Sequence, residues 1–366
     1  MDLLRMAPMA GVVIVHSIYL TQPVDSFGAN AVLMFLHTNR ELFFFVTAFV
    51  LSLSTRFWER PIDRMPFWRK RFPPVLFPYL FWTLIYWITD LMRFQPDVGL
   101  AAWWLGSDLW LGWFDLYFLL VTMQLYLFFP LLAWLIQRTR GHHLQLVAVS
   151  AAIELAITTV MQYWWPDMPG WVQWWFSSAQ VEVTSYQLFF LLGALCAVHF
   201  DEVRAWITAH RGRTFLLALA GGLVGEGWYL LNMALGQTSS QAANVLQPAE
   251  AILVVASLLA LWVLAEWAVA RFPADGRLWK ALRFAADASF GVFLVHMLVL
   301  TALYYTPVYH LIGFDRLPSP IATLLTIAIA LTVTAAFVAL LRHLPLAKLT
   351  TGRPRKRWTA TERVAA

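Results

Sequence analysis

The hydrophobic positions of the chain fall into long blocks that short polar segments separate. Each block has roughly 20 mostly apolar residues, the length of α-helix that crosses the hydrocarbon core of a bilayer. We expect ten such spans, near residues 6–22, 32–54, 74–92, 113–136, 144–162, 183–199, 214–235, 248–270, 288–307 and 320–341. The pattern predicts an all-α, polytopic transmembrane domain over residues 1–341 and a basic cytoplasmic tail over 342–366.

The composition supports a membrane protein over a soluble one. Hydrophobic residues make up 60% of the chain and charged residues 13%, whereas soluble domains are about a quarter charged. The first apolar block lacks the small-residue cleavage site of a signal peptide, and Gln22-Pro23-Val24-Asp25 leads directly to the next block. The single cysteine, Cys196, lies inside the sixth block, so no internal disulfide is possible.

Basic residues alternate between the connecting segments. Of the 26 Lys and Arg residues, all but Arg40, Arg93 and Arg316 lie in every second connection or near the chain ends. Because cytoplasmic loops carry the Lys/Arg excess, both termini are predicted to be cytoplasmic. The net charge of +5 then reflects topology, and we expect membrane lipids, not nucleic acid, as partners.

Many of the 20 tryptophans lie at the outer ends of the predicted spans. Two outer segments are especially rich, with Trp103, Trp104, Trp110 and Trp113 in one and Trp164, Trp165, Trp171, Trp174 and Trp175 in the other. An interfacial aromatic belt explains them, since indole rings favour the headgroup zone. A platform on which sugar rings stack is the alternative.

Arg5 and His16 are the first candidates for chemistry, because charged groups inside a membrane are costly. Eleven helical steps turn through about 1100°, so the two side chains share one face, about 16 Å apart along the axis. Arg5 would lie at the cytoplasmic surface, where a guanidinium suits phosphates. His16 would lie near mid-membrane as a general base. The alternative is a topology anchor at Arg5 and an interhelical hydrogen bond at His16.

Five segments, taken in order, resemble acyltransferase family 3, the membrane O-acyltransferases of bacterial surface glycans. They are Asp2-Leu-Leu-Arg5 with His16-Ser17, Arg40-Glu-Leu-Phe-Phe-Phe-Val-Thr-Ala-Phe-Val-Leu51, Phe67-Trp-Arg-Lys-Arg-Phe72 with Pro78-Tyr79, Leu116-Tyr-Phe-Leu119 with Gln124-Leu-Tyr126 and Phe129-Pro130, and Ser289-Phe-Gly-Val-Phe-Leu-Val-His296. The resemblance covers most of the chain, and ten helices with inward termini is also the core topology of that family.

The resemblance implies an enzyme of the bacterial cytoplasmic membrane. It implies that His16 and Arg5 are the catalytic pair, and that Arg5 binds the acyl donor with the basic residues Arg69, Lys70 and Arg71. The donor would be acyl-CoA, usually acetyl-CoA, used as a co-substrate without a tightly bound cofactor. The acceptor would be a hydroxyl on an extracytoplasmic glycan or a related molecule.

The chain departs from the family pattern at three places. The Arg-x-x-Arg of the basic loop fails because Pro74 stands three residues after Arg71, and the usual Ser-Gly of the second segment is Thr47-Ala48. Asp115 stands where many members have a histidine before Leu-Tyr-Phe. The resemblance therefore does not assign the phosphate-binding residue among Arg69, Lys70 and Arg71, or the role of the group at position 115.

Further polar residues in the apolar blocks are possible auxiliary groups. These are Arg40, Glu41, Asp115, Glu226 and His296. Together with Glu154, Glu250 and Glu266, they also fit a different class of protein, a non-enzymatic transporter or exporter of a glycan or lipid-linked substrate, in which buried carboxyls relay protons. We expect no metal site, because His142-His143 has no further ligands at suitable spacing.

Overall fold

The computed structural model describes residues 2–273 and 276–355, with no account of the side chains of residues 2–5, 166 and 174–176. This part of the chain is helical and contains no strand. The longer helices are α1 (Asp2–Thr21), α2 (Phe27–His37), α3 (Asn39–Thr55), α5 (Pro73–Phe94), α6 (Val98–Leu111), α7 (Tyr117–Arg138), α8 (His143–Thr159), α10 (Gln187–Val198), α11 (Phe200–Ala209), α12 (Arg211–Ala234), α14 (Pro248–Arg271), α15 (Arg277–Tyr304) and α17 (Ser319–Leu341).

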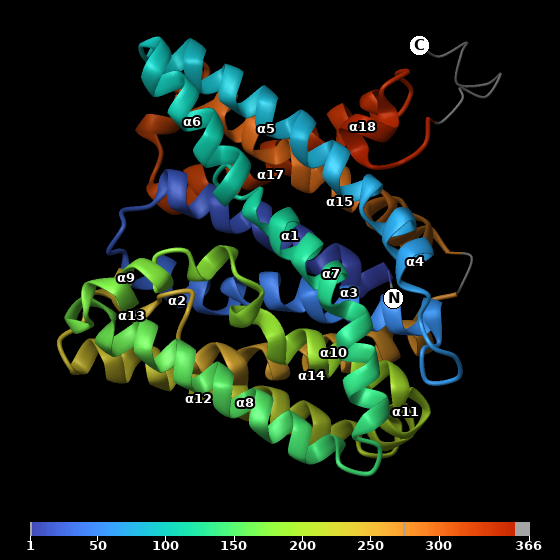
Figure 1. Cartoon of the computed structure of the whole chain (residues 1–366). Helices are drawn as coiled ribbons and strands as arrows, with labels where there is room; N and C mark the ends of the chain where they lie inside the picture. Colours follow the sequence, from blue (N-terminus) through green and yellow to red (C-terminus); the bar gives the residue numbers. More distant parts are fainter. Residues whose placement is uncertain (1, 274–275, 356–366) are drawn as a thin grey trace.

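These helices lie mostly side by side, with α1 in the middle of the bundle (Figure 1). The helix α1 contacts α2, α3, α15 and α17, and two further pairs, α3 with α10 and α12 with α14, pack closely. The short helices α4 (Arg64–Arg71) and α9 (Gly170–Phe176) lie at opposite ends of the bundle (Figure 1). The bundle therefore has two ends that carry connections and a lateral surface between them.

All ten predicted spans coincide with helices, but the count of ten crossings is not confirmed. Within the described residues, seven helices are long and apolar enough to cross a membrane, or eight if α10 and α11, bent by 87°, form one span. The first predicted span lies in α1, where the apolar stretch Met6–Thr21 is shorter than the seven spanning helices. The second is divided into α2 and α3. The remaining crossings and the orientation of the termini stay predictions.

The division between α2 and α3 has a local cause at Thr38. The Thr38 hydroxyl donates a hydrogen bond to the Phe35 carbonyl oxygen at 2.7 Å, and the Asn39 amide donates to the carbonyl oxygen of Leu36. Such side chains compete with the backbone N–H groups for helical carbonyls and interrupt a helix. An apolar block of the right length therefore contains a break that its hydropathy does not predict.

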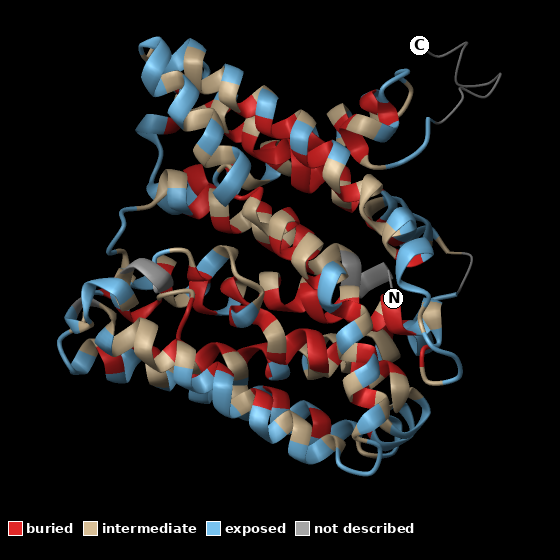
Figure 2. Ribbon diagram, in the orientation of Figure 1, coloured by how far each residue is buried: buried red, intermediate tan, exposed pale blue. Residues whose placement is uncertain are grey.

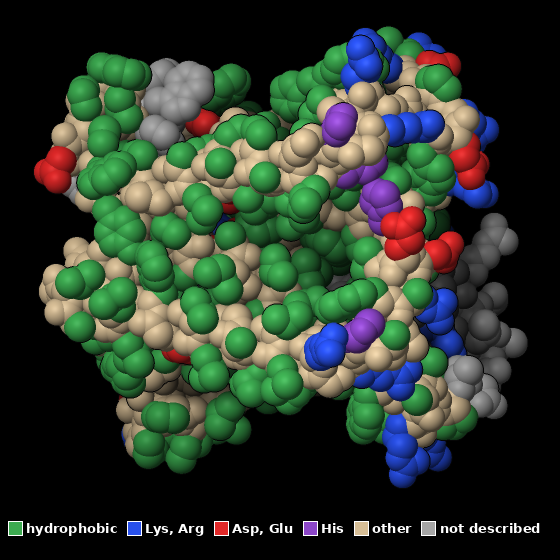
Figure 3. All heavy atoms as spheres, turned by 90° about the horizontal axis from the view of Figure 1, so that it is seen from below, with side chains coloured by type: hydrophobic (Ala, Val, Ile, Leu, Met, Phe, Trp, Pro, Cys, Tyr) green, Lys and Arg blue, Asp and Glu red, His purple; other side chains and the backbone are tan. Residues whose placement is uncertain are grey.

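Buried residues gather where the helices face one another, and exposed residues lie on the outside of the bundle (Figure 2). Large hydrophobic side chains point outward along α12 and α17, for example Leu223 and Leu324. Lys and Arg side chains gather at one end in Figure 3, called here the basic end. An apolar belt with basic residues at one end is the arrangement expected of a membrane protein with one cytoplasmic face.

Two helix backbones approach each other closely at Gly193 of α10 and Phe45 of α3. A Cβ atom added at Gly193 would overlap the carbonyl oxygen of Phe45 and lie 3.0 Å from its Cα. Only glycine leaves room for this contact, the usual role of small residues between membrane helices. The position fixes α3, and therefore Arg40 and Glu41 at its first turn, against the bundle.

Near the end of the described chain, α18 (Ala347–Thr351) packs against α5 and α15. The Trp82 indole N–H donates to the Thr350 carbonyl oxygen at 2.9 Å, and Thr351 is buried. The beginning of the predicted tail is therefore folded onto the bundle, while residues 356–366 lie outside the described part of the chain.

Candidate active site

A cavity of about 250 Å³ lies between α1, α3, α7 and α15. It is lined by side chains from the last turns of α1, the first turns of α3 and α7, and two connections, at Gln180 and Val245. These features belong to the end of the bundle opposite the basic end. Among the lining residues are His16, Tyr19, His37, Arg40, Phe114, Asp115, Tyr117 and Phe293.

Beside the cavity, three residues that are far apart in the sequence come together; His16 and Asp115 line the cavity, whereas His296 lies behind them and is not a lining residue. His16 of α1 and His296 of α15 have ring centroids 5.2 Å apart. The Asp115 carboxylate Oδ2 lies 3.4 Å from His296 Nε2. One nitrogen of each histidine and one carboxylate oxygen lie within 4.8 Å of one another. We call His16, Asp115 and His296 the cavity triad.

Asp115 reaches the cavity because the chain turns sharply between α6 and α7. Gly112 has φ +81° and Phe114 has φ +37°, two left-handed conformations in one short turn, of which the first favours glycine. Trp113 between them stacks on Tyr86 of α5, with ring centroids 4.1 Å apart. The turn ends with Asp115 buried and 4% exposed.

His296 is buried and held in one orientation by its own helix. Its Nδ1 lies 2.6 Å from the carbonyl oxygen of Phe293. A carbonyl can only accept, so Nδ1 carries the hydrogen and Nε2 of a neutral ring carries a lone pair. The Nε2 atom faces Asp115, so the tautomer of His296 is set by geometry.

The cavity also contains residues that the sequence reasoning missed. The Tyr19 hydroxyl lies 2.8 Å from His37 Nε2, and both side chains line the cavity with Gln180 and Val245. Tyr19 follows His16 by three residues, so helical periodicity alone could have placed it on the same face. Gln180 and Val245 have no comparable signal, because the tertiary fold brings their connections over the cavity.

Arg40 and Glu41 bind each other beside the cavity. Arg40 Nη2 lies 2.8 Å from Glu41 Oε1, and Glu41 is 2% exposed. Arg40 also donates to the carbonyl oxygen of Val245 at 2.9 Å, and its guanidinium lies 5.5 Å from the centre of the Tyr186 ring. The guanidinium that lines the cavity therefore has its charge balanced by its neighbour in the chain.

The predicted donor-binding residues lie at the basic end. Arg69, Lys70 and Arg71 form the last turn of α4. Arg69 and Lys70 are exposed, and Arg71 Nη2 donates to Ser54 Oγ at 2.8 Å. Arg5 belongs to the first turns of α1, but its side chain lies outside the described residues.

Glu154, Glu226, Glu250 and Glu266 of the transporter alternative are not among the residues that line the cavity. Glu266 faces Arg211 at 3.3 Å near the basic end. Glu154 accepts a hydrogen bond from Gln187 at 3.4 Å. Glu226 of α12 and Glu250 of α14 contain buried carboxylate oxygens that have no hydrogen-bond partner within the described residues.

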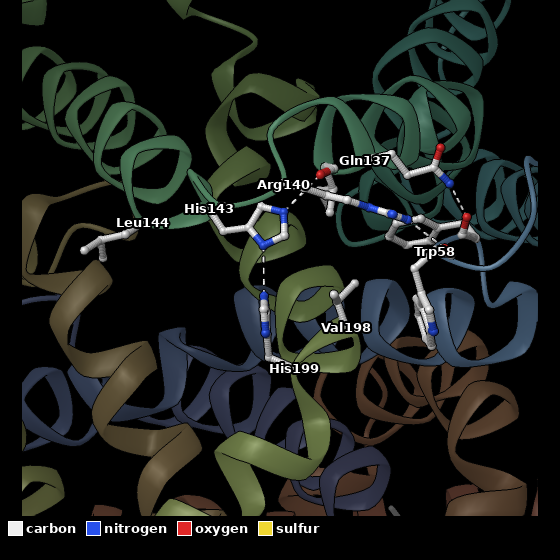
Figure 4. A pocket seen from close by; sticks show the side chains of 10 residues that line it. Trp58, Gln137, Arg140, His143, Leu144, Val198 and His199 are labelled. Atoms are coloured by element: carbon white, nitrogen blue, oxygen red, sulfur yellow. Dashed lines mark hydrogen bonds between the residues drawn. The ribbon is translucent and has the colours of Figure 1, made fainter.

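A second cavity, of about 620 Å³, opens at the basic end between α7, α8 and α10. His143 and His199 point toward one another across it (Figure 4), with His143 Nδ1 2.9 Å from His199 Nε2. His143 Nε2 lies 2.9 Å from the Ile136 carbonyl oxygen, and His199 Nδ1 lies 3.1 Å from Glu202 Oε2. A cluster of buried aromatic side chains, including Phe44, Phe57, Phe129 and Phe190, packs together between α3, α7 and α10. This cavity shares no lining residue with the cavity that His16 and Asp115 line.

Comparison with known proteins identifies the family. A family model described as an acyltransferase domain matches residues 1–341, which is nearly the whole chain. Searches of curated proteins and of solved structures gave no match. The match covers the whole bundle and all three residues of the cavity triad. The chain therefore belongs to acyltransferase family 3, as its sequence motifs indicated, and is a membrane acyltransferase.

Proposed function

We propose that this acyltransferase moves an acyl group, most simply acetyl, from cytoplasmic acyl-CoA to a hydroxyl of an extracytoplasmic glycan or a related acceptor. The enzyme would operate in the bacterial cytoplasmic membrane. The observation that carries the proposal is the position of His16. It lines a cavity near one end of the bundle, within a chain whose family is that of acyltransferases.

The two ends of the bundle suit the two substrates. Basic residues on α4 lie at the basic end, where charge-assisted hydrogen bonds can hold the phosphates of a CoA thioester. Arg5 precedes His16 by eleven residues on α1, a rise of about 16 Å. A donor with a phosphorylated head and a long narrow arm fits this separation, and its thioester would meet the cavity from the basic end.

The opposite end suits an acceptor. Gln180 and Val245, which line the cavity, belong to connections at that end. A third cavity, of about 280 Å³, shares Tyr19, Gln180 and Val245 with the cavity that His16 lines. It is also lined by the uncharged polar residues Gln22, Asn30, Ser240 and Asn244. Amides and hydroxyls of this kind can hydrogen-bond to an acceptor that has several hydroxyl groups.

The reaction requires that the acceptor hydroxyl be activated beside the thioester carbonyl. In direct transfer, the hydroxyl oxygen forms the new ester bond, the carbon–sulfur bond breaks, and the hydroxyl proton ends on the CoA thiol. In a relay, the acyl group passes first to His16 and then to the hydroxyl. Both routes place His16 at the reacting atoms.

The proposal can be tested with purified protein in liposomes. Radiolabelled acetyl-CoA is supplied only at the face that carries the basic end. Cell-envelope glycans are supplied on the other side, and loss of thioester and transfer of label are measured. His16→Ala should abolish label transfer while the protein remains inserted. His142→Ala, at an exposed histidine of the basic end, is the matched control and should transfer label at the wild-type rate.

Two results would contradict the proposal. Normal turnover in His16→Ala would remove His16 from the chemistry. An intact thioester in the wild-type reaction, with glycans present, would exclude acetyl-CoA as the donor. Brief reaction followed by acid quench separates the two routes, because label bound to the protein in wild type but not in His16→Ala indicates an acyl-histidine.

A further inference from the structure

We propose that the cavity triad is a binding site for one divalent metal ion of the zinc type, with His16, Asp115 and His296 as its ligands. The inference goes beyond the proposed function, because metal binding can be measured whether or not acyl groups are transferred. It revises the expectation from the sequence, in which only His142-His143 was weighed as a metal site.

The first argument is the fixed tautomer of His296. Its Nδ1–H donates to the Phe293 carbonyl oxygen, which leaves the lone pair of Nε2 directed at Asp115. A metal-bound histidine nearly always donates its other N–H to a carbonyl or carboxylate in this way. The backbone of α15 therefore presents His296 as a ligand.

The second argument is the number of polar atoms left without partners. Within the described residues, His16 Nδ1, His296 Nε2 and both carboxylate oxygens of Asp115 are buried and make no hydrogen bond. Leaving one such atom unpaired is unfavourable, and more so for a charged group. Four of them converge in one place, so the site lacks a positively charged species that all of them can contact.

A proton cannot satisfy this arrangement. A single proton between His296 and Asp115 would pair Nε2 with one carboxylate oxygen. His16 Nδ1 and the second carboxylate oxygen would both remain unpaired. A metal ion contacts all three residues at once, because one potential ligand atom of each lies within 4.8 Å of the others. Two imidazoles and one carboxylate are a common ligand set for Zn²⁺ in sites that keep a fourth position open.

The surroundings of the triad fit such a site. The three ligands come from α1, α15 and the turn before α7, so the fold and not one flexible segment brings them together. The cavity of about 250 Å³ lies against them and leaves room for an oxygen at the open position. The nearby charge of Arg40 is balanced by Glu41 at 2.8 Å and therefore does not oppose a cation.

A divalent ion held here would polarise an oxygen in the cavity and make an acceptor hydroxyl easier to deprotonate. This consequence rests on the proposed function, whereas the site itself rests on the geometry of the triad. His16 would then hold the ion, and the ion would activate the acceptor hydroxyl in place of a general base. The expected loss of turnover in His16→Ala is the same.

The test is metal analysis of the full chain, purified in detergent through a tag without histidine and without chelators. Mass spectrometry of the metal content should give about one equivalent of zinc per wild-type chain, as expected for a single set of three protein ligands. Asp115→Asn and His296→Gln should each lower this by at least about tenfold, since they remove a ligand. His37→Gln, which changes a histidine of the same cavity outside the triad, should keep the wild-type content.

A second measurement does not depend on the folding of these variants. Wild-type protein stripped with a chelator and titrated with Co²⁺ should develop the visible absorption of a nitrogen- and oxygen-bound ion and saturate at one equivalent. The proposal is overturned if the wild-type chain carries no zinc and takes up no Co²⁺, or if the metal persists in both triad variants, which would mark an adventitious ion.

Acyl transfer by metal-free protein would retain the proposed function and reject the catalytic use of the metal. Metal binding without acyl transfer would do the reverse.

Discussion

Gly193→Ala should loosen the contact between α3 and α10. A Cβ at this position would overlap the Phe45 carbonyl oxygen and lie 3.0 Å from Phe45 Cα, whereas non-bonded carbons prefer about 3.5–4.0 Å. The obstacle is backbone, so no side chain can rotate away. The two helices must separate by about 1 Å at this point.

The expected cost follows from the packing of the contact. Forcing an extra methyl group into a well-packed interface destabilises by about 1–3 kcal/mol. At about 1.4 kcal/mol for each factor of ten, local opening of the α3–α10 contact should become about 5- to 150-fold more frequent. Gly227 in α12 has no atom within 4 Å of an added Cβ, so Gly227→Ala should leave the contact unchanged.

The single cysteine provides the assay. Cys196 lies on α10 three residues after Gly193, is only partly exposed, and packs beside Phe45, Val46 and Phe49 of α3. The rate at which a maleimide labels Cys196 in native detergent-solubilised protein therefore measures opening of this contact. A temperature ramp with the same reagent gives the midpoint of global unfolding.

Gly193→Ala should label faster than wild type by the factor given above, and Gly227→Ala should label at the wild-type rate. Equal labelling of wild type and Gly193→Ala would refute the reasoning, because it would mean that the two backbones do not meet at Gly193. Faster labelling in both variants would show that the cysteine responds to something other than the α3–α10 contact.

Three other predictions concern charge and topology. Glu41→Gln leaves the buried Arg40 guanidinium without its counter-charge, so it should destabilise the protein by about 3–5 kcal/mol and lower the thermal midpoint. The control Glu59→Gln, in an exposed pair, should change the stability by about 1 kcal/mol or less. Equal midpoints for the two variants would contradict this. Hydrogen bonds from the Ser240 hydroxyl and N–H lower the pKa of Asp25 below its ordinary 3.8, so this loop contact persists above that value and is lost as the pH falls through the lower pKa of the folded state. Hydrogen exchange of the Ser240 amide should therefore show an acid step that Asp25→Asn lacks. A step present in both proteins would mean that another group titrates. Reporter tags at the two ends should both be accessible only from the cytoplasm if ten helices cross the membrane, and tags on opposite sides would exclude an even number.

The sequence predicted the helices well because the membrane constrains them strongly. A backbone in hydrocarbon must satisfy its own hydrogen bonds, so a long apolar block can only be a helix. The apolar blocks near 248–270 and 320–341 accordingly match α14 and α17 closely. The interruption at Thr38 escaped prediction because it depends on two side-chain hydrogen bonds and not on hydropathy.

The site was predicted in parts but not as a whole. His16, Asp115 and His296 could each be singled out, because polar groups inside apolar blocks are rare and costly. That they lie together beside one cavity depends on how α1, α15 and the Gly112 turn pack, and periodicity within one helix contains no such information. His37 and Gln180 were missed for the same reason, since only the tertiary fold brings them beside Tyr19.

The pairing of Arg40 with Glu41 has a consequence for how the protein is made. Both residues belong to the first turn of α3, so the pair needs no other segment in order to form. A lone charge at the centre of an inserting helix costs about 2.5–3.5 kcal/mol on translocon scales, and an ion pair within one segment would enter the bilayer as a neutral unit. During biogenesis, this segment can therefore enter the bilayer before the helices that later enclose it have been synthesised.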